Sequence, residues 1–493
     1  MFPPEIWLQI AYHIPPHLLA DLYAVNRQWY DMAMNARYRQ ISFAFLNRGM
    51  LHDLTRLRDP AVARRVRSLH IHPYFVKEIL DKAVHEPQPP LSPHSLRGKL
   101  SGLFRDHGHN KRLARRSRTP ATLDMDNPAE LVKSVVQVIS GLTNLSHVHI
   151  AWSGLDHIHD LPVPFLAAAF RPSVLQLSLE ISLEKTVDLL SHTSALTDLE
   201  ELDLFLRLDH QLSAIEYERI LVEHVAPAIN RLHRSLQKLS LRLCEPVDLA
   251  PLFDSLRHMS CLDNLSISIP TSAPHLGDPA GFGKFLDRHR YTLSHLTLRA
   301  TELSGPGLTV ADEEPLSAWV NDALSFLSGP VKLRSLEASL ALFPVEAAAV
   351  CLGHLGRTLT SLTLTGRYLT YDRVDELLSA VPRARLRDLR LGPVTLSPQL
   401  VDLLAERLPA LRQLALLVRD VVGCEGDLPV YYDRTEQHDG QIGSFFMEME
   451  GRRYGHWGLR AIELERSSFP YRMQYAEDYK ELFEGCVPSL CRA

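Results

Sequence analysis

The chain has 493 residues, of which 45% are hydrophobic and 23% are charged, an ordinary composition for a protein with a large core. Its length predicts about two to four globular domains or one long repeat array. The formal net charge of −5 disfavours general binding to nucleic acid or to a membrane surface, and no apolar run reaches the roughly 18 residues that span a bilayer.

The first 43 residues are rich in proline and apolar side chains, and they predict three short helices. Pro3-Pro4 favours a first helical turn, and Pro15-Pro16 ends the first helix because proline lacks the backbone N–H. A leucine cluster marks the second helix, and the third is expected to begin near Asn26. Three helices of this size cannot cover so many apolar side chains, so another surface must cover them.

This stretch contains an ordered set of residues: Pro3-x-Glu5-Ile6, Ile10, Ile14-Pro15, Leu18-Leu19-x-x-Leu22 and Val25-x-Arg27-x-Trp29. The set resembles the F-box, the adaptor motif of SCF-type ubiquitin ligases. Phe2 stands where the motif usually has leucine, and Asn26 where it often has cysteine or serine. The resemblance implies docking to Skp1 within a cullin–RING complex. An ordinary helical cap on the next domain is the alternative. The residues expected to dock are Pro3, Pro4, Ile6, Ile10, Ile14, Leu18, Leu19, Leu22, Val25 and Trp29.

Residues 44–65 are predicted to form a helical linker, because apolar side chains recur there at helical spacing. From residue 66 to about residue 470 a second pattern, L-x-x-L-x-L, returns at intervals of mostly about 25 to 40 residues, the spacing of leucine-rich repeats. Helical patterns lie between its instances. The central position of the pattern falls at Leu69, Val148, Leu177, Leu202, Leu239, Leu265, Leu296, Leu336, Leu362, Leu389, Leu414 and Ile462.

One strand and one helix per repeat predict an α/β fold, an irregular leucine-rich-repeat solenoid that follows the three-helix F-box. A parallel sheet would line a horseshoe, with the helices on the convex side. The chain is thereby divided into residues 1–43, 44–65, 66–470 and a C-terminal cap at 471–493.

Two insertions interrupt the repeats. Residues 86–128 are rich in proline, serine and arginine and predict disorder, and the basic run at 111–118 is either a signal for an anionic partner or a solvated loop. Residues 423–456 contain several aromatic side chains and are expected to pack against the repeats.

Side chains alternate along a strand, so the residues that flank the inward leucines are expected on the concave face. This face would carry adjoining acidic and basic patches with an aromatic residue between them. Because like charges on adjacent strands repel, such patches suggest a partner of complementary charge. The predicted substrate-binding residues are Glu180, Glu201, Asp203, Phe205, Lys238, Arg242 and Arg299.

Other chemistry is weakly indicated. Histidines at 70, 72, 147 and 149 could bring ligands together on neighbouring strands, but they are better interpreted as polar residues of a binding face, so no metal and no cofactor is predicted. Six scattered cysteines without a CxxC pair predict a reducing compartment, the cytoplasm, the nucleus or both. The sequence contains no phosphate loop, nucleophile elbow or HExxH motif, so the chain is not expected to be an enzyme.

Together these patterns predict a substrate-recognition adaptor of an SCF-type ubiquitin ligase, which would hold a target protein near the transfer centre. The alternatives are a repeat scaffold without a ligase role and, less favoured, a hydrolase that uses some of the 24 histidines.

Overall fold

The computed structural model of the chain describes residues 3–72, 74, 128–152, 167–207, 213–243, 248–270, 277–301, 313–327, 331–340, 345–381, 385–424, 437–466 and 476–492. The predicted disordered insertion at 86–128 lies outside the described residues except for residue 128, and so does the 425–436 part of the second insertion. The chain divides into two compact units, Met1–Val174 and Leu175–Ala493.

The first unit combines the N-terminal helices with three parallel strands. β1 pairs with β2, and β2 pairs with β3. The elements are α1 (Pro4–Tyr12), α2 (Pro16–Leu19), η1 (Ala20–Ala24), α3 (Arg27–Tyr38), β1 (Gln40–Phe43), α4 (Arg48–Arg56), α5 (Pro60–Ala63), β2 (Ser68–Ile71), α8 (Pro128–Gly141) and β3 (His147–Ala151).

The strand β1 lies where the sequence had predicted the end of the helical region. Residues 40–43 form a strand that was not predicted from the sequence. The helices α4 and α5 lie within residues 44–65, where a helical segment was expected, and connect the paired strands β1 and β2. Ile41 pairs with Leu69, and Ile41 and Phe43 are buried. The signal was present, since Tyr38, Ile41 and Phe43 repeat the L-x-x-L-x-L spacing with other apolar residues.

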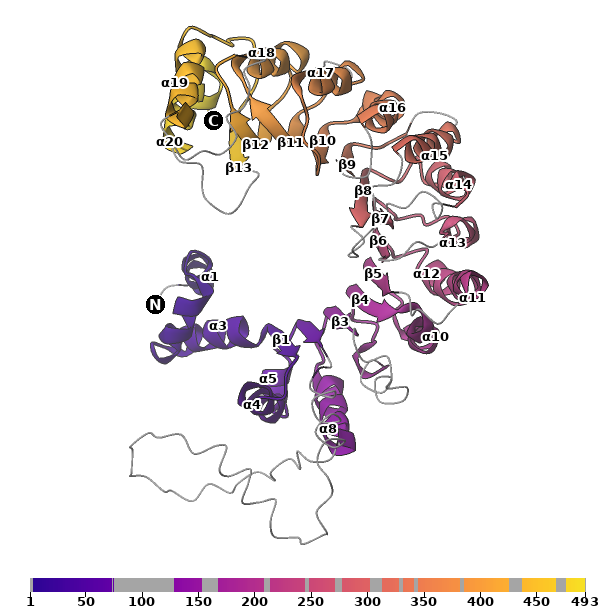
Figure 1. Cartoon of the computed structure of the whole chain (residues 1–493). Helices are drawn as coiled ribbons and strands as arrows, with labels where there is room; N and C mark the ends of the chain where they lie inside the picture. Colours follow the sequence, from indigo (N-terminus) through magenta and orange to yellow (C-terminus); the bar gives the residue numbers. More distant parts are fainter. Residues whose placement is uncertain are drawn as a thin grey trace, which may run out of the picture. The chain divides into compact units, whose positions relative to one another are not determined.

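The second unit is a parallel sheet of successive strands from β4 to β13, with the strands along its inner side and the helices outside (Figure 1). Its strands are β4 (Gln176–Ser182), β5 (Glu201–Arg207), β6 (Lys238–Leu243), β7 (Asn264–Pro270), β8 (His295–Thr301), β9 (Ser335–Ser339), β10 (Ser361–Thr365), β11 (Asp388–Leu396), β12 (Gln413–Val421) and β13 (Ala461–Arg466).

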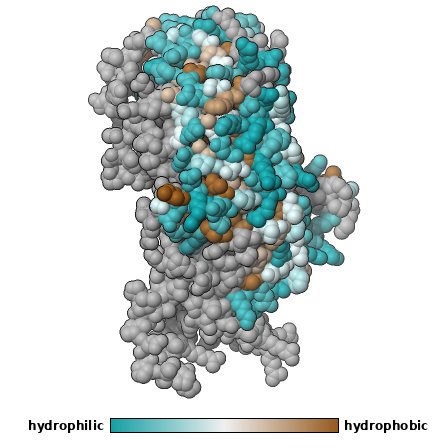
Figure 2. Space-filling view, turned by 90° about the vertical axis from the view of Figure 1, so that its right-hand side faces the viewer, coloured by the Kyte–Doolittle hydropathy of each residue, from teal (hydrophilic) through white to brown (hydrophobic). Residues whose placement is uncertain are grey.

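The helical segments alternate with these strands. They are α10 (Leu183–Ser191), η2 (His192–Ala195), α11 (Ala214–Ile220), η3 (Leu221–Val225), α12 (Ala226–Arg231), α13 (Ala250–Ser255), α14 (Pro279–Arg288), α15 (Glu313–Ser325), α16 (Val345–Leu355), η5 (Gly356–Thr358), α17 (Tyr371–Ser379), α18 (Pro398–Arg407), α19 (Gln437–Glu450), α20 (Ala476–Cys486) and η6 (Leu490–Arg492). The helix-covered side is hydrophilic over most of its described area, with scattered apolar residues (Figure 2).

Each of the twelve predicted central positions lies in a strand, and those of β4 to β13 are in register from Leu177 to Ile462. The central leucines from Leu177 to Leu414 are buried. The fold of this unit is an α/β leucine-rich-repeat solenoid, as predicted.

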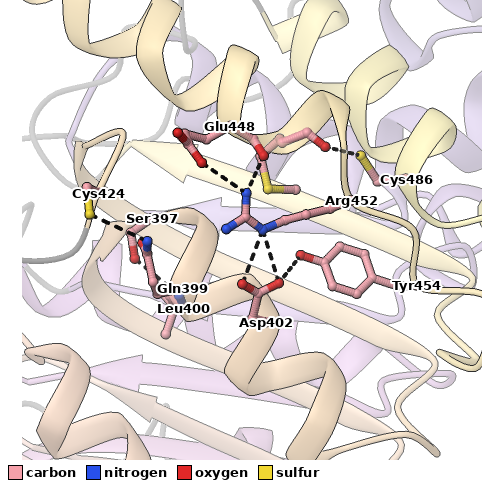
Figure 3. A network of polar contacts seen from close by, with 10 residues as sticks. Ser397, Gln399, Leu400, Asp402, Cys424, Glu448, Arg452, Tyr454 and Cys486 are labelled. Carbon is pink, nitrogen blue, oxygen red and sulfur yellow. Dashed lines mark hydrogen bonds and ion pairs between the residues drawn. The ribbon is translucent and has the colours of Figure 1, made fainter.

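A polar cluster joins the last helices to the repeats (Figure 3). Arg452, just after α19, donates from Nε to both carboxylate oxygens of Asp402 on α18, at 3.2 and 3.1 Å. The buried Tyr454 donates its hydroxyl to Asp402 Oδ1 at 2.5 Å, and Cys486 Sγ on α20 donates to the Met449 carbonyl at 3.2 Å. Burial and this carboxylate raise the pKa of Tyr454. The cluster is a structural clasp between α18 and the terminal helices.

We expect Asp402→Ala to lower the free energy of unfolding by about 1–3 kcal/mol, because the buried Tyr454 hydroxyl loses its acceptor. Adding Tyr454→Phe should recover part of that loss, since the hydroxyl is then removed as well. Thermal and denaturant unfolding of the two variants measure the difference. Equal stability of the single and double variants would contradict a clasp that depends on the hydroxyl.

A buried histidine joins two neighbouring repeats. His289 follows α14; its Nε2 accepts the Met259 backbone N–H at 2.9 Å, and its Nδ1 lies 2.8 Å from the Phe285 carbonyl. Since Nε2 is an acceptor, Nδ1 carries the proton and donates. His258 stacks on the ring with centroids 5.2 Å apart. Burial, together with the positive charge of Arg288 and the neighbouring His258, lowers the pKa of His289 to about 4.

This pKa makes the fold acid-sensitive. The unfolded chain takes up the proton near its ordinary pKa of about 6.5, before the folded chain does, so stability falls as the pH drops from about 6.5 to about 4. The loss approaches about 3 kcal/mol at the lower end of that window. His289→Gln should be less stable than wild type at pH 7, but its free energy of unfolding should change less across this pH window. The control His354→Gln, at an exposed position of α16 in another repeat, should keep the wild-type slope in unfolding measurements. Equal slopes for wild type and His289→Gln would contradict this assignment.

Candidate functional site

The N-terminal helices pack around two tryptophans. Trp29 on α3 is buried, and its ring meets that of Trp7 on α1 edge-on, with centroids 5.6 Å apart. Asn26 caps α3 by accepting the Trp29 backbone N–H at 3.0 Å. Ala33 and Tyr38, further along α3, are also buried. The helices therefore have a small aromatic core of their own.

Much apolar surface stays outside that core. Ile6 and Ile10 on α1 are each 40% exposed, Leu18 on α2 is 46% exposed, and Val25 is 62% exposed. Among the described residues, thirteen large hydrophobic side chains are exposed, and seven of them lie between Ile6 and Tyr30. The three tyrosines of this set, Tyr12, Tyr23 and Tyr30, were absent from the sequence prediction. We call these seven residues the N-terminal apolar surface: Ile6, Ile10, Tyr12, Leu18, Tyr23, Val25 and Tyr30.

Not every predicted docking residue reaches this surface. Leu19 and Trp29 are only 8% and 5% exposed, so they support the helices from inside and are not free to contact a partner. Ile14 and Leu22 are half-buried, and Pro3 is exposed. The side chain of Pro4 is outside the described residues. The sequence pattern could not separate the two roles, because core and docking positions are both apolar.

Helix α3 is fixed to the first strands. Only Arg39 separates α3 from β1. Arg65, just before β2, donates to Asp31 Oδ1 at 2.7 Å and to Asn35 Oδ1 at 2.6 Å, both on α3. Of the N-terminal apolar surface only Tyr30 lies on α3, but α1, α2 and η1, which carry most of the other members, pack against this helix. The helix that supports the surface therefore continues directly into the sheet of this unit.

In the second unit, the face of β4 to β8 brings together the predicted substrate-binding residues. Glu180, Phe205, Arg242, Ser268 and Arg299 occupy one register row. Glu201 pairs in register with Lys238 in a second row. Asp203 pairs with Ser240 and lies on β5 between Glu201 and Phe205, so its row is between the other two. Seven side chains from four strands therefore share one surface, as alternation along each strand requires.

The charges on this surface are paired across strands. Lys238 Nζ lies 3.3 Å from Glu201 Oε2, and Arg242 lies 2.7 Å from Asp203 Oδ2. Arg299 bonds Glu337 on β9 at 2.8 Å. The predicted adjoining of acidic and basic residues is correct. The inferred cost of uncompensated like charges is wrong, because each of these basic residues faces a carboxylate.

Phe205 lies between two guanidinium groups. Arg242 and Arg207 are 5.1 and 5.3 Å from its ring centroid, within cation–π range. Arg207 also bonds Glu180 at 2.6 Å. Sequence reasoning missed Arg207, although the alternation 201, 203, 205, 207 places it on the same face. The result is a half-buried aromatic ring framed by two ion pairs.

Three histidines of the first unit lie close together on or next to neighbouring strands. The His70 and His149 rings are 5.2 Å apart, and His72 is 5.6 Å from His149. Burial, then the two neighbouring histidines, lowers the pKa of His70. Within the part of the chain that the structure describes, no group of three or more His, Cys, Asp or Glu side chains could hold a metal ion.

One cluster imitates a hydrolase triad. Ser294 Oγ lies 2.6 Å from His295 Nδ1 and 2.5 Å from Asp263 Oδ1, and Asp263 Oδ2 lies 3.3 Å from the same Nδ1. A catalytic triad uses the two imidazole nitrogens separately, one for serine and one for the carboxylate. Here a single nitrogen faces both, and Ser294 is buried. The cluster is a polar staple between β7 and β8, not a nucleophilic site.

No protein-family model and no curated protein matches the chain. Among solved structures it is similar to the leucine-rich-repeat-containing protein LegL7 from Legionella pneumophila, at 14% identity and a TM-score of 0.38, over 73% of this chain and 95% of that one. It is also similar to the yeast Rad7 and Elc1 complex, at 17% identity and a TM-score of 0.29, over 63% of this chain and 88% of that one.

Over the described ranges, no helix combines the length and the apolar composition that crossing a membrane requires.

A charge-swap series tests the pairing on the repeat face. Arg242→Asp should lower stability because it places two carboxylates on facing strands, and adding Asp203→Arg should restore most of it. We expect a coupling of about 1 kcal/mol or less, the range for partly exposed pairs. Chemical unfolding of wild type, both single variants and the swap measures this coupling. Additive losses would contradict a direct Asp203–Arg242 interaction.

Proposed function

We propose that this chain is an F-box-type substrate receptor: the N-terminal apolar surface docks to Skp1, and the face of β4 to β8 holds a target protein. The observation that carries the proposal is the concentration of exposed apolar side chains on the first three helices. A soluble chain seldom leaves such a group uncovered without a partner. Four of the seven residues of this surface, Ile6, Ile10, Leu18 and Val25, also carry the resemblance to the F-box.

The activity would be positional. No catalytic group on this chain is required, because ubiquitin would be transferred by bound partners while the receptor raises the local concentration of the target. The direct continuation of α3 into β1, together with the Arg65 bonds to α3, supports rigid presentation of the docking helices by the first strands.

The face of β4 to β8 suits a protein target in two ways. Its polar groups are largely paired before binding, so an incoming surface need not leave a bare charge buried. Phe205, framed by Arg207 and Arg242, offers the aromatic anchor that interface centres favour.

The docking half of the proposal is tested by replacing Ile6 and Leu18 together with Asp. Capture of purified Skp1 should be lost, because each interface anchor typically contributes about 2 kcal/mol or more and a buried unpaired charge adds a further cost. The matched control replaces Ile215 and Met447, exposed apolar residues of the second unit, with Asp.

Calorimetry with purified Skp1 measures binding, and circular dichroism checks that both variants fold. Retained binding by the Ile6/Leu18 variant, or no binding by the wild type, would contradict the receptor proposal and favour a repeat scaffold without a ligase role. Phe205→Ala, which leaves the N-terminal helices untouched, should keep Skp1 binding and lose target proteins in affinity purification.

A further inference from the structure

A row of arginines follows one edge of the last repeats. Arg334, Arg387, Arg412 and Arg460 each stand immediately before a strand, namely β9, β11, β12 and β13, and Thr360 holds the same position before β10. All four arginines are exposed. We call these four residues the arginine row. The equivalent positions before β4 to β8 are Leu175, Glu200, Gln237, Asp263 and Ser294, so within the second unit the row is confined to the C-terminal repeats. In the first unit, Arg39 and Arg67 hold this position before β1 and β2.

Backbone hydrogen bonds fix the spacing of the row. The Arg334 carbonyl accepts from Thr360 N at 2.8 Å, Thr360 from Arg387 at 2.8 Å, Arg387 from Arg412 at 2.7 Å and Arg412 from Arg460 at 2.7 Å. Neighbouring positions are therefore one strand spacing apart, about 4.8 Å. From β9 to β13 the row covers four spacings, about 19 Å. About six residues of extended peptide have that length.

The row is left without counter-charges. Elsewhere in this unit arginines pair readily, as Arg242 does with Asp203, Arg299 with Glu337 and Arg390 with Glu465. Within the described part of the chain, no ion pair or side-chain hydrogen bond engages a guanidinium group of the arginine row. Among the described residues, the acidic residue nearest in sequence to each member of the row forms no ion pair with it; these residues are Glu337, Asp388, Glu406 and Glu463, and Glu337 pairs with Arg299 instead.

Further cations strengthen the same edge. Lys332 and Arg385 each stand two residues before a member of the row, and Arg357 follows α16; all three are exposed. Arg385 donates to the Arg357 carbonyl at 3.1 Å, which holds two neighbouring repeats together without neutralising either charge. Like charges on adjacent strands repel, so the fold carries this edge at a modest cost.

We propose that the arginine row binds an extended acidic segment, rich in Asp and Glu, of a partner protein. Guanidinium groups pair with carboxylates through two parallel N–H···O bonds, and adjacent arginines can engage successive acidic side chains of one peptide. Among described residues 331–424 there is no exposed Phe, Tyr or Trp on which nucleic-acid bases could stack. The net charge of −5 also opposes a general nucleic-acid site. An acidic peptide fits these features better.

This site is separate from the face of β4 to β8 and does not depend on the docking function proposed for the N-terminal helices. Its charges are unpaired where those of β4 to β8 are paired. The arginine row would therefore speed the association of a partner that carries an acidic segment, and it would orient that partner when the face of β4 to β8 binds it.

The test uses the full chain and a fluorescein-labelled peptide of about eight residues in which Glu and Gly alternate, with a Gln-for-Glu peptide as the neutral comparison. Fluorescence anisotropy should show binding of the Glu peptide alone, weakening as NaCl rises. The triple variant Arg387→Glu, Arg412→Glu, Arg460→Glu should weaken binding about tenfold or more. The matched control Arg219→Glu, Arg234→Glu, Arg257→Glu makes the same change in net charge at exposed positions of earlier repeats and should weaken it less than about twofold.

Three outcomes would overturn the proposal. The first is no binding of the Glu peptide by wild type, and the second is equal weakening in both triple variants. The third is a single-stranded oligonucleotide that binds more tightly than the peptide and is lost with the row variant, which would make the edge a nucleic-acid site. Thermal unfolding confirms that both variants fold. Skp1 binding, measured on the same variants, should not change, so this proposal and the docking proposal can fail separately.

Discussion

The constraint on which the repeat unit depends is the register of its central leucines. A parallel sheet gains stability only if every strand presents its apolar side chains inward, and a slip of one residue would turn them all outward. From Leu177 on β4 to Leu414 on β12 the central residues pair in register and are buried. Once that register is fixed, the alternation of side chains along each strand also fixes the face on which each flanking residue lies. The polar surface of β4 to β8 and the arginine row are consequences of the same register.

This constraint explains why the sequence predicted so much of the fold. The period of two along each strand and the recurrence of L-x-x-L-x-L are local signals, and they located twelve strands and the shared face of residues such as Glu201, Phe205 and Arg242. The strand β1 was not predicted, because Tyr38, Ile41 and Phe43 stand where the repeat pattern has leucines. Its neighbours were helical, so the composition of the segment resembled the end of a helix. Tertiary pairing with β2, not local propensity, decides its conformation.

What the sequence could not predict is how polar side chains are shared between repeats. Residues on adjacent strands are some 25 to 40 positions apart, and insertions change the interval from one repeat to the next, so cross-strand partners follow only from the three-dimensional register. That is why Arg242 appeared to belong to a basic patch although it bonds Asp203, and why the four row arginines appeared unremarkable although they align. Similarly, Leu19 and Ile6 look alike in sequence, and only packing places one inside and the other at the surface.

Some side chains of this chain are paired within the fold, and others are left exposed to solvent. Asp402, Arg452 and Tyr454 satisfy one another at the junction with the terminal helices, as do His289 and its two backbone partners between repeats. Such groups are already hydrogen-bonded to one another or to the backbone, so their main role is to hold repeats together. The N-terminal apolar surface and the arginine row are the reverse, since each keeps side chains in solvent that would gain free energy from a complementary surface. One is apolar and the other is cationic, so a single partner of uniform chemistry cannot satisfy both. A chain with two such surfaces is suited to bringing two different proteins together.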